Sequence, residues 1–377
     1  MKKGWQTKML GELCDVLDHK RKPITKRDRD AGEYPYYGAT GVLDHVAGYL
    51  FDEPLVLVGE DGAKWASGEN TAFAVEGKIW VNNHAHVLRP HRTELLDNWL
   101  IYHINHSDLT EFVSGLTVPK LNQGSLREIP IPVPPLAEQQ RIVGLLDEAF
   151  EGLATAKANA EKNLQNARAL FESHLQSVFT QRGPGWVQKK LSDVCGITST
   201  LVDPRKNEFL DLTHVGAGNI ETKTGVFVDL KTAREEGLIS GKFLFDESMV
   251  LYSEIRPYLM KVARPDFPGL CSADMYPLAP FPKEITRDYL FHLLLSKTFT
   301  DYAVLGSARA GMPKVNREHL FEFKVWLPDV KKQKQLAANL DDLHEETQRL
   351  AHIYEQKIAA LEALKKSLLH QALSGEL

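Results

Sequence analysis

The stretch Ile129-Pro-Ile-Pro-Val-Pro-Pro135, which continues as Leu136-Ala-Glu-Gln-Gln-Arg-Ile-Val143, divides the chain into two kinds of sequence. Proline lacks an amide proton and has a fixed φ, so the first part can be neither a helix nor a central strand and marks the end of a globular unit. Beyond it, apolar residues alternate at spacings of three and four as far as Val178, and the next proline is Pro184. This pattern predicts one long helix with a single apolar stripe.

The same order of parts occurs twice along the chain. Gly4-Trp5 recurs as Gly185-Trp186, a shift of 181 residues, and Pro119-Lys-Leu-Asn122 recurs as Pro313-Lys-Val-Asn316, a shift of 194 residues. Repeats of this length are whole domains rather than the short units of a solenoid. We therefore expect four parts, with limits at 1–135 for the first domain, 136–182 for the first helix, 183–330 for the second domain and 331–377 for the second helix.

Two helices that each carry one apolar stripe most simply bury these stripes against each other. The first helix leaves one globular domain and leads into the other, and the second helix leaves that other domain. The pair should therefore be antiparallel, with the two halves of the chain related by a pseudo-twofold axis. The predicted fold class is α+β: two mixed α/β domains joined by two long antiparallel, coiled-coil helices.

The composition supports packed domains in a reducing compartment. Apolar residues make up 43% of the 377 residues, no apolar run is long enough to span a bilayer, and the first residues lack the apolar core of a signal peptide. Three cysteines without a CxxC pair fit structural thiols, so we expect a cytoplasmic protein. The net charge of -5 is not that of a free-standing nucleic-acid binder, although a local basic patch can still bind DNA.

Motifs for several enzyme chemistries are missing from the sequence. There is no GxxxxGKS/T loop for a nucleoside triphosphate, no GxGxxG turn for a dinucleotide, no GxSxG nucleophile elbow and no Cys/His zinc spacing. His84 and His86 lie on one face of an alternating stretch, which we interpret as a polar strand face rather than a metal site. The missing catalytic set favours a binding module over an enzyme.

Five segments, together with the duplication, resemble those of a known family. They are Pro35-Tyr-Tyr-Gly-Ala-Thr-Gly41, Val58-Gly-Glu-Asp-Gly62, the stretch 126–143, Ile255-Arg-Pro-Tyr-Leu259 and the tail 367–377. The run Pro135-Leu-Ala-Glu-Gln-Gln-Arg-Ile-Val143 at the start of a long helix is the most specific of them. Over nearly its full length, the chain resembles the specificity subunit of type I restriction-modification systems.

The resemblance implies a function and a set of partners. Members of this family carry two target-recognition domains, recognise a bipartite, asymmetric target in double-stranded DNA, and dock methyltransferase subunits, expected to be two, and restriction/translocase subunits. The specificity subunit is not catalytic. Methyl transfer to adenine N6 takes place on the partners, which bind S-adenosylmethionine, ATP and magnesium, so we expect no cofactor on this chain. Two alternatives stay open: a fusion with its own enzyme activity, and a non-DNA coiled-coil scaffold with two interaction domains.

We expect DNA contacts from loops of both domains. Phosphate contacts need Lys and Arg, whereas base reading needs side chains held in a fixed direction. Tyr36 and Tyr37 form an aromatic turn that either approaches DNA or caps the fold, and Lys64 lies in a glycine-bounded loop after a strand. The predicted phosphate contacts of the first domain form one basic cluster: Lys20, Arg21, Lys22, Lys26 and Arg27.

The corresponding candidates in the second domain are Arg205, Lys206, His214, Lys223, Arg256 and Arg309. Arg256 precedes Pro257, which predicts an extended backbone suited to a fixed reader. The stretch 37–41 has no evident counterpart in the second domain, and the stretch 212–216 has none in the first. We therefore expect the two half-sites in DNA to differ.

A lysine and an asparagine occur at matching positions in the two halves: Lys120 and Asn122 in the first half correspond to Lys314 and Asn316 in the second. We include them among the candidate DNA contacts. A role common to both halves must be independent of the DNA sequence, so it is either a phosphate contact or a turn that stabilises the fold.

Overall fold

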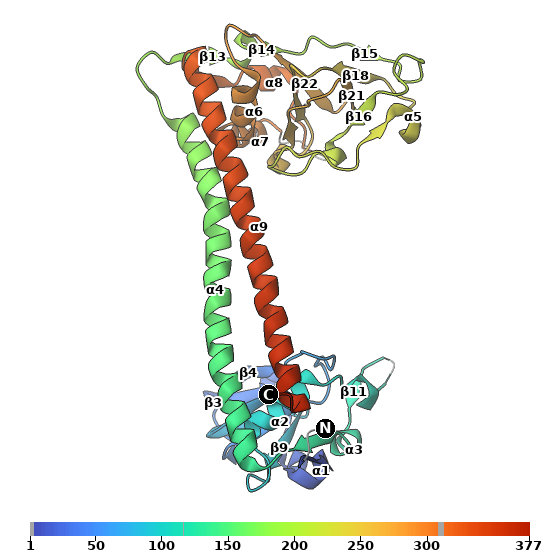
Figure 1. The fold of residues 1–377 in the computed structure, drawn as a ribbon, viewed down its shortest axis with the longest axis vertical. Coiled ribbons are helices and arrows are strands. Elements are labelled where there is room, and N and C mark those ends of the chain that lie inside the picture. The colour runs from blue at the N-terminus through green and yellow to red at the C-terminus, as the bar shows by residue number, and fades with distance from the viewer. Residues whose placement is uncertain (1–3, 116, 308–312) are drawn as a thin grey trace. The chain divides into compact units, whose positions relative to one another are not determined.

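A computed structural model describes residues 4–115, 117–307 and 313–377 (Figure 1). The contacts divide the chain into two compact units. The first unit consists of Met1–Glu161 and Glu355–Leu377, and the second consists of Lys162–Tyr354. Two long helices, α4 (Leu136–Thr180) and α9 (Val330–Ser374), contribute to both units. No helix in the described part of the chain combines the length and the apolar content that crossing a membrane needs.

The first unit is built around an antiparallel sheet with the strand order β2-β9-β6-β7. Its strands are β2 (Cys14–Val16), β9 (Ala85–Pro90), β6 (Leu55–Gly59) and β7 (Ala72–Val75). Every residue of β6 is buried, with Val56 and Val58 in one apolar core and Leu55 and Leu57 in another. This strand therefore separates the two cores of the first unit.

A second sheet of the first unit has the order β4-β3-β8-β5, in which β3 is parallel to β8. Its strands are β4 (Gly41–Val46), β3 (Ala31–Gly38), β8 (Lys78–Val81) and β5 (Phe51–Asp52). The remaining elements are β1 (Gln6–Met9), β12 (Pro130–Val133), β10 (Val113–Ser114), β11 (Lys120–Leu121), α1 (Leu10–Leu13), α2 (Asp97–His106), α3 (Gln123–Arg127) and three 3-10 turns at Asp18–Lys20, Lys26–Asp28 and Thr110–Phe112.

The second unit repeats this plan. One sheet has the order β14-β22-β19-β20, and the other has the order β15-β18-β21-β16-β17. Their strands are β14 (Cys195–Gly196), β22 (Met275–Pro280), β19 (Val250–Ser253), β20 (Val262–Ala263), β15 (Leu201–Val202), β18 (Lys242–Phe245), β21 (Gly269–Cys271), β16 (Thr213–Val215) and β17 (Lys231–Thr232). The remaining elements are β13 (Val187–Lys190), β23 (Lys324–Leu327), α5 (Ala233–Glu236), α6 (Arg287–Leu295), α7 (Lys297–Leu305), α8 (Arg317–Phe321) and 3-10 turns at Leu191–Asp193, Ala217–Asn219 and Pro257–Leu259.

The strand register corrects one expectation about the repeat. Tyr37 on β3 pairs in parallel with Val81, and Val215 on β16 pairs in parallel with Cys271. The two strands are therefore equivalent, and each is followed by Gly-Ala, at 38–39 and at 216–217. The expectation that the stretches 37–41 and 212–216 have no counterparts was therefore wrong. Loops of unequal length in the two units give these strands a different sequence shift from the rest of the repeat.

The predicted fold class is confirmed, with two mixed α/β units and two long helices. In the first unit, Lys157 of α4 pairs with Glu362 of α9 at 2.7 Å, and Arg141 donates to the Leu377 carbonyl at 3.0 Å. The two helices are therefore antiparallel there. In the second unit, the Phe171 ring of α4 lies against His344 of α9, with the ring centroids 4.6 Å apart.

All three cysteines are buried, with free thiols. Burial raises the pKa of the Cys14, Cys195 and Cys271 thiols to about 12, so they stay protonated at neutral pH. Cys14 and Cys195 occupy the same position of the repeat. Each pairs with the proline that ends the neighbouring strand, Pro90 of β9 or Pro280 of β22. This placement favours the structural interpretation of the thiols.

A buried glutamine attaches each long helix to its globular domain. The Gln139 side chain accepts from the Leu96 amide at 2.9 Å and donates to the carbonyls of Glu94 and Pro134 at 2.7 and 2.9 Å. The Gln333 side chain accepts from the Thr286 amide at 3.0 Å. It donates to the carbonyls of Glu284 and Pro328 at 2.9 and 3.0 Å. The second helix begins with the basic run Val330-Lys-Lys-Gln-Lys334, and its Gln333 makes the same attachment as Gln139 of the first helix.

A second contact between helix and domain uses different chemistry in the two units. In the first unit, the Tyr102 hydroxyl of α2 donates to Asp147 of α4. In the second unit, His292 of α6 lies 2.8 Å from Asp341 of α9, which Arg264 also contacts at 2.7 Å. Burial alone would raise the pKa of Asp341, but the hydrogen bonds and charges of His292 and Arg264 hold it well below its usual range.

We predict that Gln139→Ala and Gln333→Ala each lower the free energy of unfolding by about 2 to 4 kcal/mol, because each leaves buried backbone groups without partners. Urea denaturation measures this change. Gln140→Ala is the matched control, since Gln140 is the exposed neighbour on the same helix turn. Equal stability of the Gln139 and Gln140 variants would show that these hydrogen bonds do not hold the helix.

Candidate nucleic-acid interface

The repeated Pro-Lys-Leu/Val-Asn segments begin short helices. The Asn122 side chain accepts from the Ser125 amide at 3.0 Å and caps α3, and the Asn316 side chain accepts from the His319 amide at 2.8 Å and caps α8. An N-cap asparagine satisfies an amide that the helix itself leaves unpaired. Of the two roles open for these asparagines, the geometry favours the turn that stabilises the fold.

The lysines of the same segments pair with buried carboxylates. The Lys120 ammonium lies 2.8 Å from Glu60, and the Lys314 ammonium lies 2.5 Å from Glu254. Both glutamates are buried, at 6% and 2% exposure, whereas the two lysine side chains are 42% and 46% exposed. We call each of these pairs a Glu–Lys clip.

Backbone bonds and a third side chain complete each clip. Leu121 donates to the Glu60 carbonyl and Val315 donates to the Glu254 carbonyl, both at 2.8 Å. Nε2 of His86 lies 2.7 Å from the Leu121 carbonyl. In the second unit, the Tyr276 hydroxyl donates to the Val315 carbonyl at 3.0 Å. The clips thus share one geometry, although a histidine completes one of them and a tyrosine completes the other.

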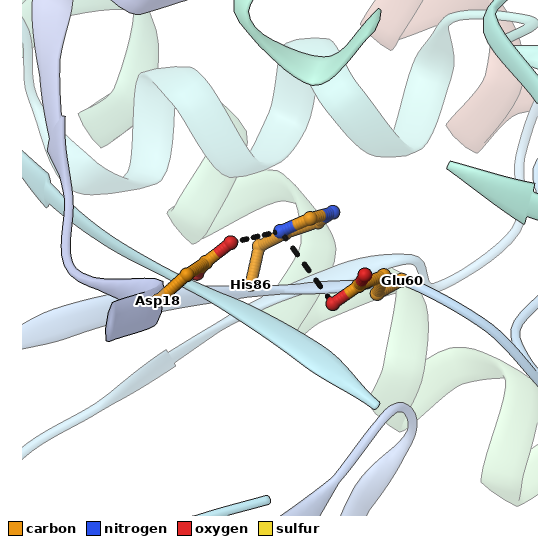
Figure 2. A group of neighbouring side chains, drawn as sticks. All are labelled: Asp18, Glu60 and His86. Carbon is orange, nitrogen blue, oxygen red and sulfur yellow. Dashed lines mark hydrogen bonds and ion pairs between the residues drawn. The ribbon is translucent and has the colours of Figure 1, made fainter. Parts of the chain in front are cut away.

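Figure 2 shows His86 between the carboxylates of Asp18 and Glu60. Nδ1 of His86 lies 2.6 Å from Asp18 and 3.9 Å from Glu60. These three residues are close enough together to suggest a metal site. However, each ring nitrogen already faces an acceptor, and Arg21 and Lys120 pair with the carboxylates. The donor set fits an ion network better than a metal ion.

The electrostatics of this network stabilise the charged form of Asp18. Burial alone would raise the pKa of Asp18, but the hydrogen bond and charge of His86, the Val87 amide and the Arg21 charge lower it overall. A carboxyl group with a lowered pKa contributes stability above its ordinary titration range and loses it as the pH falls. The contribution of Asp18 to the stability of the first unit is therefore present at neutral pH and is lost in acid.

The basic cluster of the first unit divides into one half-buried member, Arg21, and four exposed members. The Arg21 side chain is 13% exposed, contacts Asp18 and Glu60, and donates to the Ala85 carbonyl at 2.8 Å. These contacts favour a structural role for Arg21. The four remaining members are exposed: Lys20, Lys22, Lys26 and Arg27. Their phosphate contacts stay a prediction.

The two tyrosines also differ in position. Tyr36 is buried, and its hydroxyl accepts from the Ile24 amide at 2.9 Å while the Arg29 guanidinium lies 4.3 Å from its ring centre. Tyr36 thus holds, from inside the fold, the backbone of the segment 20–27 that carries the basic cluster. Tyr37 is half-buried beside Phe73, with the ring centroids 6.0 Å apart.

Two candidates on loops of the two units are largely exposed and lie beside a carboxylate. The Lys64 side chain is 80% exposed, with its ammonium 3.8 Å from Glu69. The Arg205 side chain is 66% exposed and makes two hydrogen bonds to Asp203, at 2.9 and 2.8 Å. Lys206 beside it is exposed. Exposed ion pairs of this kind contribute little stability, so these side chains can exchange their partner for a phosphate.

Of three further candidates of the second unit, two pair with glutamates and one lies outside the described residues. His214 is buried with Nδ1 2.9 Å from Glu236, and burial lowers its pKa although the Glu236 charge opposes the shift. Lys223 pairs with Glu172 of α4 at 2.7 Å. Arg309 lies outside the described residues.

Arg256 departs from its predicted conformation. Its φ of 50° and ψ of 60° are left-handed, so the expectation of an extended backbone was wrong. A following proline favours an extended backbone, and the left-handed conformation of Arg256 departs from this preference. Two backbone hydrogen bonds hold this turn: the Arg256 amide donates to the Pro313 carbonyl at 2.8 Å, and the Leu259 amide donates to the Arg256 carbonyl at 2.9 Å.

Sequence reasoning missed Glu254, although a signal was present. Glu254 follows Glu60 by 194 residues, the same shift that separates Lys314 from Lys120. Four residues at one common shift indicate two copies of one contact. Tyr276 could not be found in this way, because its counterpart His86 is a different residue type.

Comparison with known proteins places the chain among restriction-modification proteins. A family model described as the type I restriction modification DNA specificity domain matches residues 2–164 and 184–362. The EcoDI type I restriction enzyme specificity subunit of Escherichia coli is 27% identical over 411 residues, which cover 99% of this chain and 88% of that protein.

Two solved structures share the fold. One is from work on complex assembly and conformational transition of a type I R-M system, with a TM-score of 0.72, 16% identity and coverage of 100% of this chain and 99% of the other. The second is the HsdS subunit of Thermoanaerobacter tengcongensis, with a TM-score of 0.60, 17% identity and coverage of 100% and 98%.

We predict that Lys314→Met destabilises the second unit by about 1 to 3 kcal/mol, because it leaves the buried Glu254 carboxylate without its cation. Lys314→Arg keeps a cation there and is the matched control. The double variant Glu254→Gln/Lys314→Met removes both charges and should recover much of the loss. Thermal unfolding measures all three variants. If the double variant is less stable than Lys314→Met, the glutamate has another essential contact.

Proposed function

Since the chain belongs to the family of type I restriction-modification specificity subunits, we propose that it recognises a bipartite, asymmetric target in double-stranded DNA. One half-site is read by each unit. The observation that carries this proposal is the repeat itself: two units share a sheet plan, a Glu–Lys clip and a glutamine attachment, but differ in the loops around them. A common frame with unlike loops suits two unlike readers.

The proposal assigns different tasks to the frame and to the loops. The frame residues form bonds inside the protein, which leaves phosphate contacts to the exposed cations Lys20, Lys22, Lys26 and Arg27 in the first unit. In the second unit, the exposed Arg205 and Lys206 are the comparable residues. Phosphate contacts set orientation and affinity, and base contacts supply sequence preference.

Partners complete the proposed function. The chain docks adenine-N6 methyltransferase subunits, two in number, and restriction/translocase subunits, and these partners bind S-adenosylmethionine, ATP and magnesium. The net charge of -5 supports a role within such a complex, because an acidic chain alone releases few counterions from DNA. The alternative of a non-DNA scaffold does not account for the match to the DNA specificity family over both halves.

We predict that Lys20→Ala/Lys22→Ala weakens binding of the methyltransferase complex to all duplexes alike. The dependence of log K on log salt should become shallower by about 1.8, because two phosphate contacts are lost. Arg21 is left intact, since it belongs to the ion network. Fluorescence anisotropy over a salt series measures the slope.

The control for this pair is Lys283→Ala/Lys324→Ala, which removes the same charge from two other exposed positions. A changed methylation sequence in the Lys20/Lys22 variant, or a salt slope equal to that of the control, would contradict the assignment of these lysines to phosphates. If the unaltered complex shows no preference for any DNA sequence, the proposed function itself fails.

A further inference from the structure

Arg256 takes the place that a glycine holds in the first unit. Gly62 and Arg256 each lie two residues beyond the glutamate of a clip, and they differ by the same 194 residues as the clips do. Gly62 has a φ of 69° and Arg256 has a φ of 50°. A left-handed φ at this position is therefore common to both units, but only the second unit places a side chain there.

A left-handed backbone disfavours residues with a Cβ, and glycine is the usual residue there. Arg256 nevertheless adopts it, and Met260 and Lys223 beside it have φ values of 50° and 70°. The Lys223 amide donates to the Met260 carbonyl at 3.3 Å, which joins the two strained segments. Backbone strain of this kind persists where the surroundings enforce it, and it is concentrated at functional sites.

The surroundings hold the Arg256 backbone from both sides. Before it, Glu254 is clipped to Lys314 and Ile255 bridges to Lys314. After it, the buried Pro257 begins a 3-10 turn whose amides bond back to the carbonyls of Arg256 and Pro257. The position of the Arg256 Cα and the direction of its Cα–Cβ bond are thus set by the frame.

The side chain itself is exposed and available. Within the described ranges, Arg256 makes no hydrogen bond or ion pair through its guanidinium, whereas Arg205 and Arg234 on the same unit each pair with a neighbouring aspartate. An exposed arginine on an enforced backbone offers a free, planar donor fork, and its backbone need not be ordered when it binds.

We propose that Arg256 reads a guanine in the half-site of the second unit, an inference that rests on the proposed function. The guanidinium fork matches O6 and N7 of guanine in the major groove, and this is the commonest specific contact of arginine with DNA. A phosphate contact needs only a flexible cation and gives no reason for a strained backbone. Gly62 has no side chain, so the first unit lacks this reader, and the two half-sites differ at this point.

The test compares Arg256→Gly with the unaltered chain, both in complex with the methyltransferase. Glycine fits the left-handed turn, so the variant should unfold at an equal or higher temperature. Each complex selects duplexes from a randomised library, and the selected sequences are read. We expect the variant to lose a guanine preference at one position and to keep every other position. Its affinity for the duplex selected by the unaltered chain should fall roughly 5- to 150-fold.

Two further variants separate the possible roles of the arginine. Arg256→Lys keeps the charge without the fork, so the guanine preference should weaken although affinity for random DNA is kept. Arg234→Ala removes an equal charge from α5 and should leave the selected sequence unchanged.

If Arg256→Gly selects the same guanine as the unaltered chain, Arg256 does not read that base. An affinity loss that is equal for all sequences would identify a phosphate contact and also overturn the proposal. If the unaltered complex enriches no sequence, the proposed function fails, and this result is distinct from either of the others.

Discussion

A carboxylate buried at the end of a central strand needs a cation beside it, and the architecture of both units depends on this requirement. Glu60 and Glu254 follow the fully buried strands β6 and β19, and each is met by a lysine from a segment about sixty residues further along the chain. Each Glu–Lys clip joins the end of a sheet strand to the segment before a short helix, α3 or α8, which the neighbouring asparagine caps. It also sets the start of the loop that leaves the strand.

The structure common to both units, which we call the frame, keeps its bonds where the residue type differs between the units. His86 and Tyr276 bond to equivalent carbonyls, and Tyr102 and His292 contact equivalent aspartates on the long helices. Positions outside these bonds are free to differ, as Gly62 and Arg256 do. Under the proposed function, recognition of a new DNA sequence can arise from changes in loops without loss of the fold, because strand pairing and helix attachment do not involve the loop side chains.

Much of the fold followed from the sequence, since prolines and heptads act through local backbone geometry and spacing. The long helices, the duplication and the α+β class were predicted for this reason. The conformation of Arg256 was not, because the local preference for an extended backbone before proline is overridden here, where the Arg256 amide bonds to the distant Pro313 carbonyl. The equivalence of β3 and β16 was missed because unequal loops hide it from any constant shift. Of the candidate site, Lys20 and Lys22 are exposed, and their phosphate contacts stay a prediction. The half-buried position of Arg21 and the burial of Tyr36 depend on partners distant in sequence, which no local pattern reveals.

The central claim is that two units with one frame read two unlike half-sites. Sequencing of methylated adenines in a host that carries this chain with its methyltransferase tests it most directly. The account predicts methylation within two short constant blocks of different sequence, separated by a spacer of fixed length and free composition, and its loss when this chain is deleted. A single continuous block, two identical inverted blocks, or methylation that persists without the chain would contradict it.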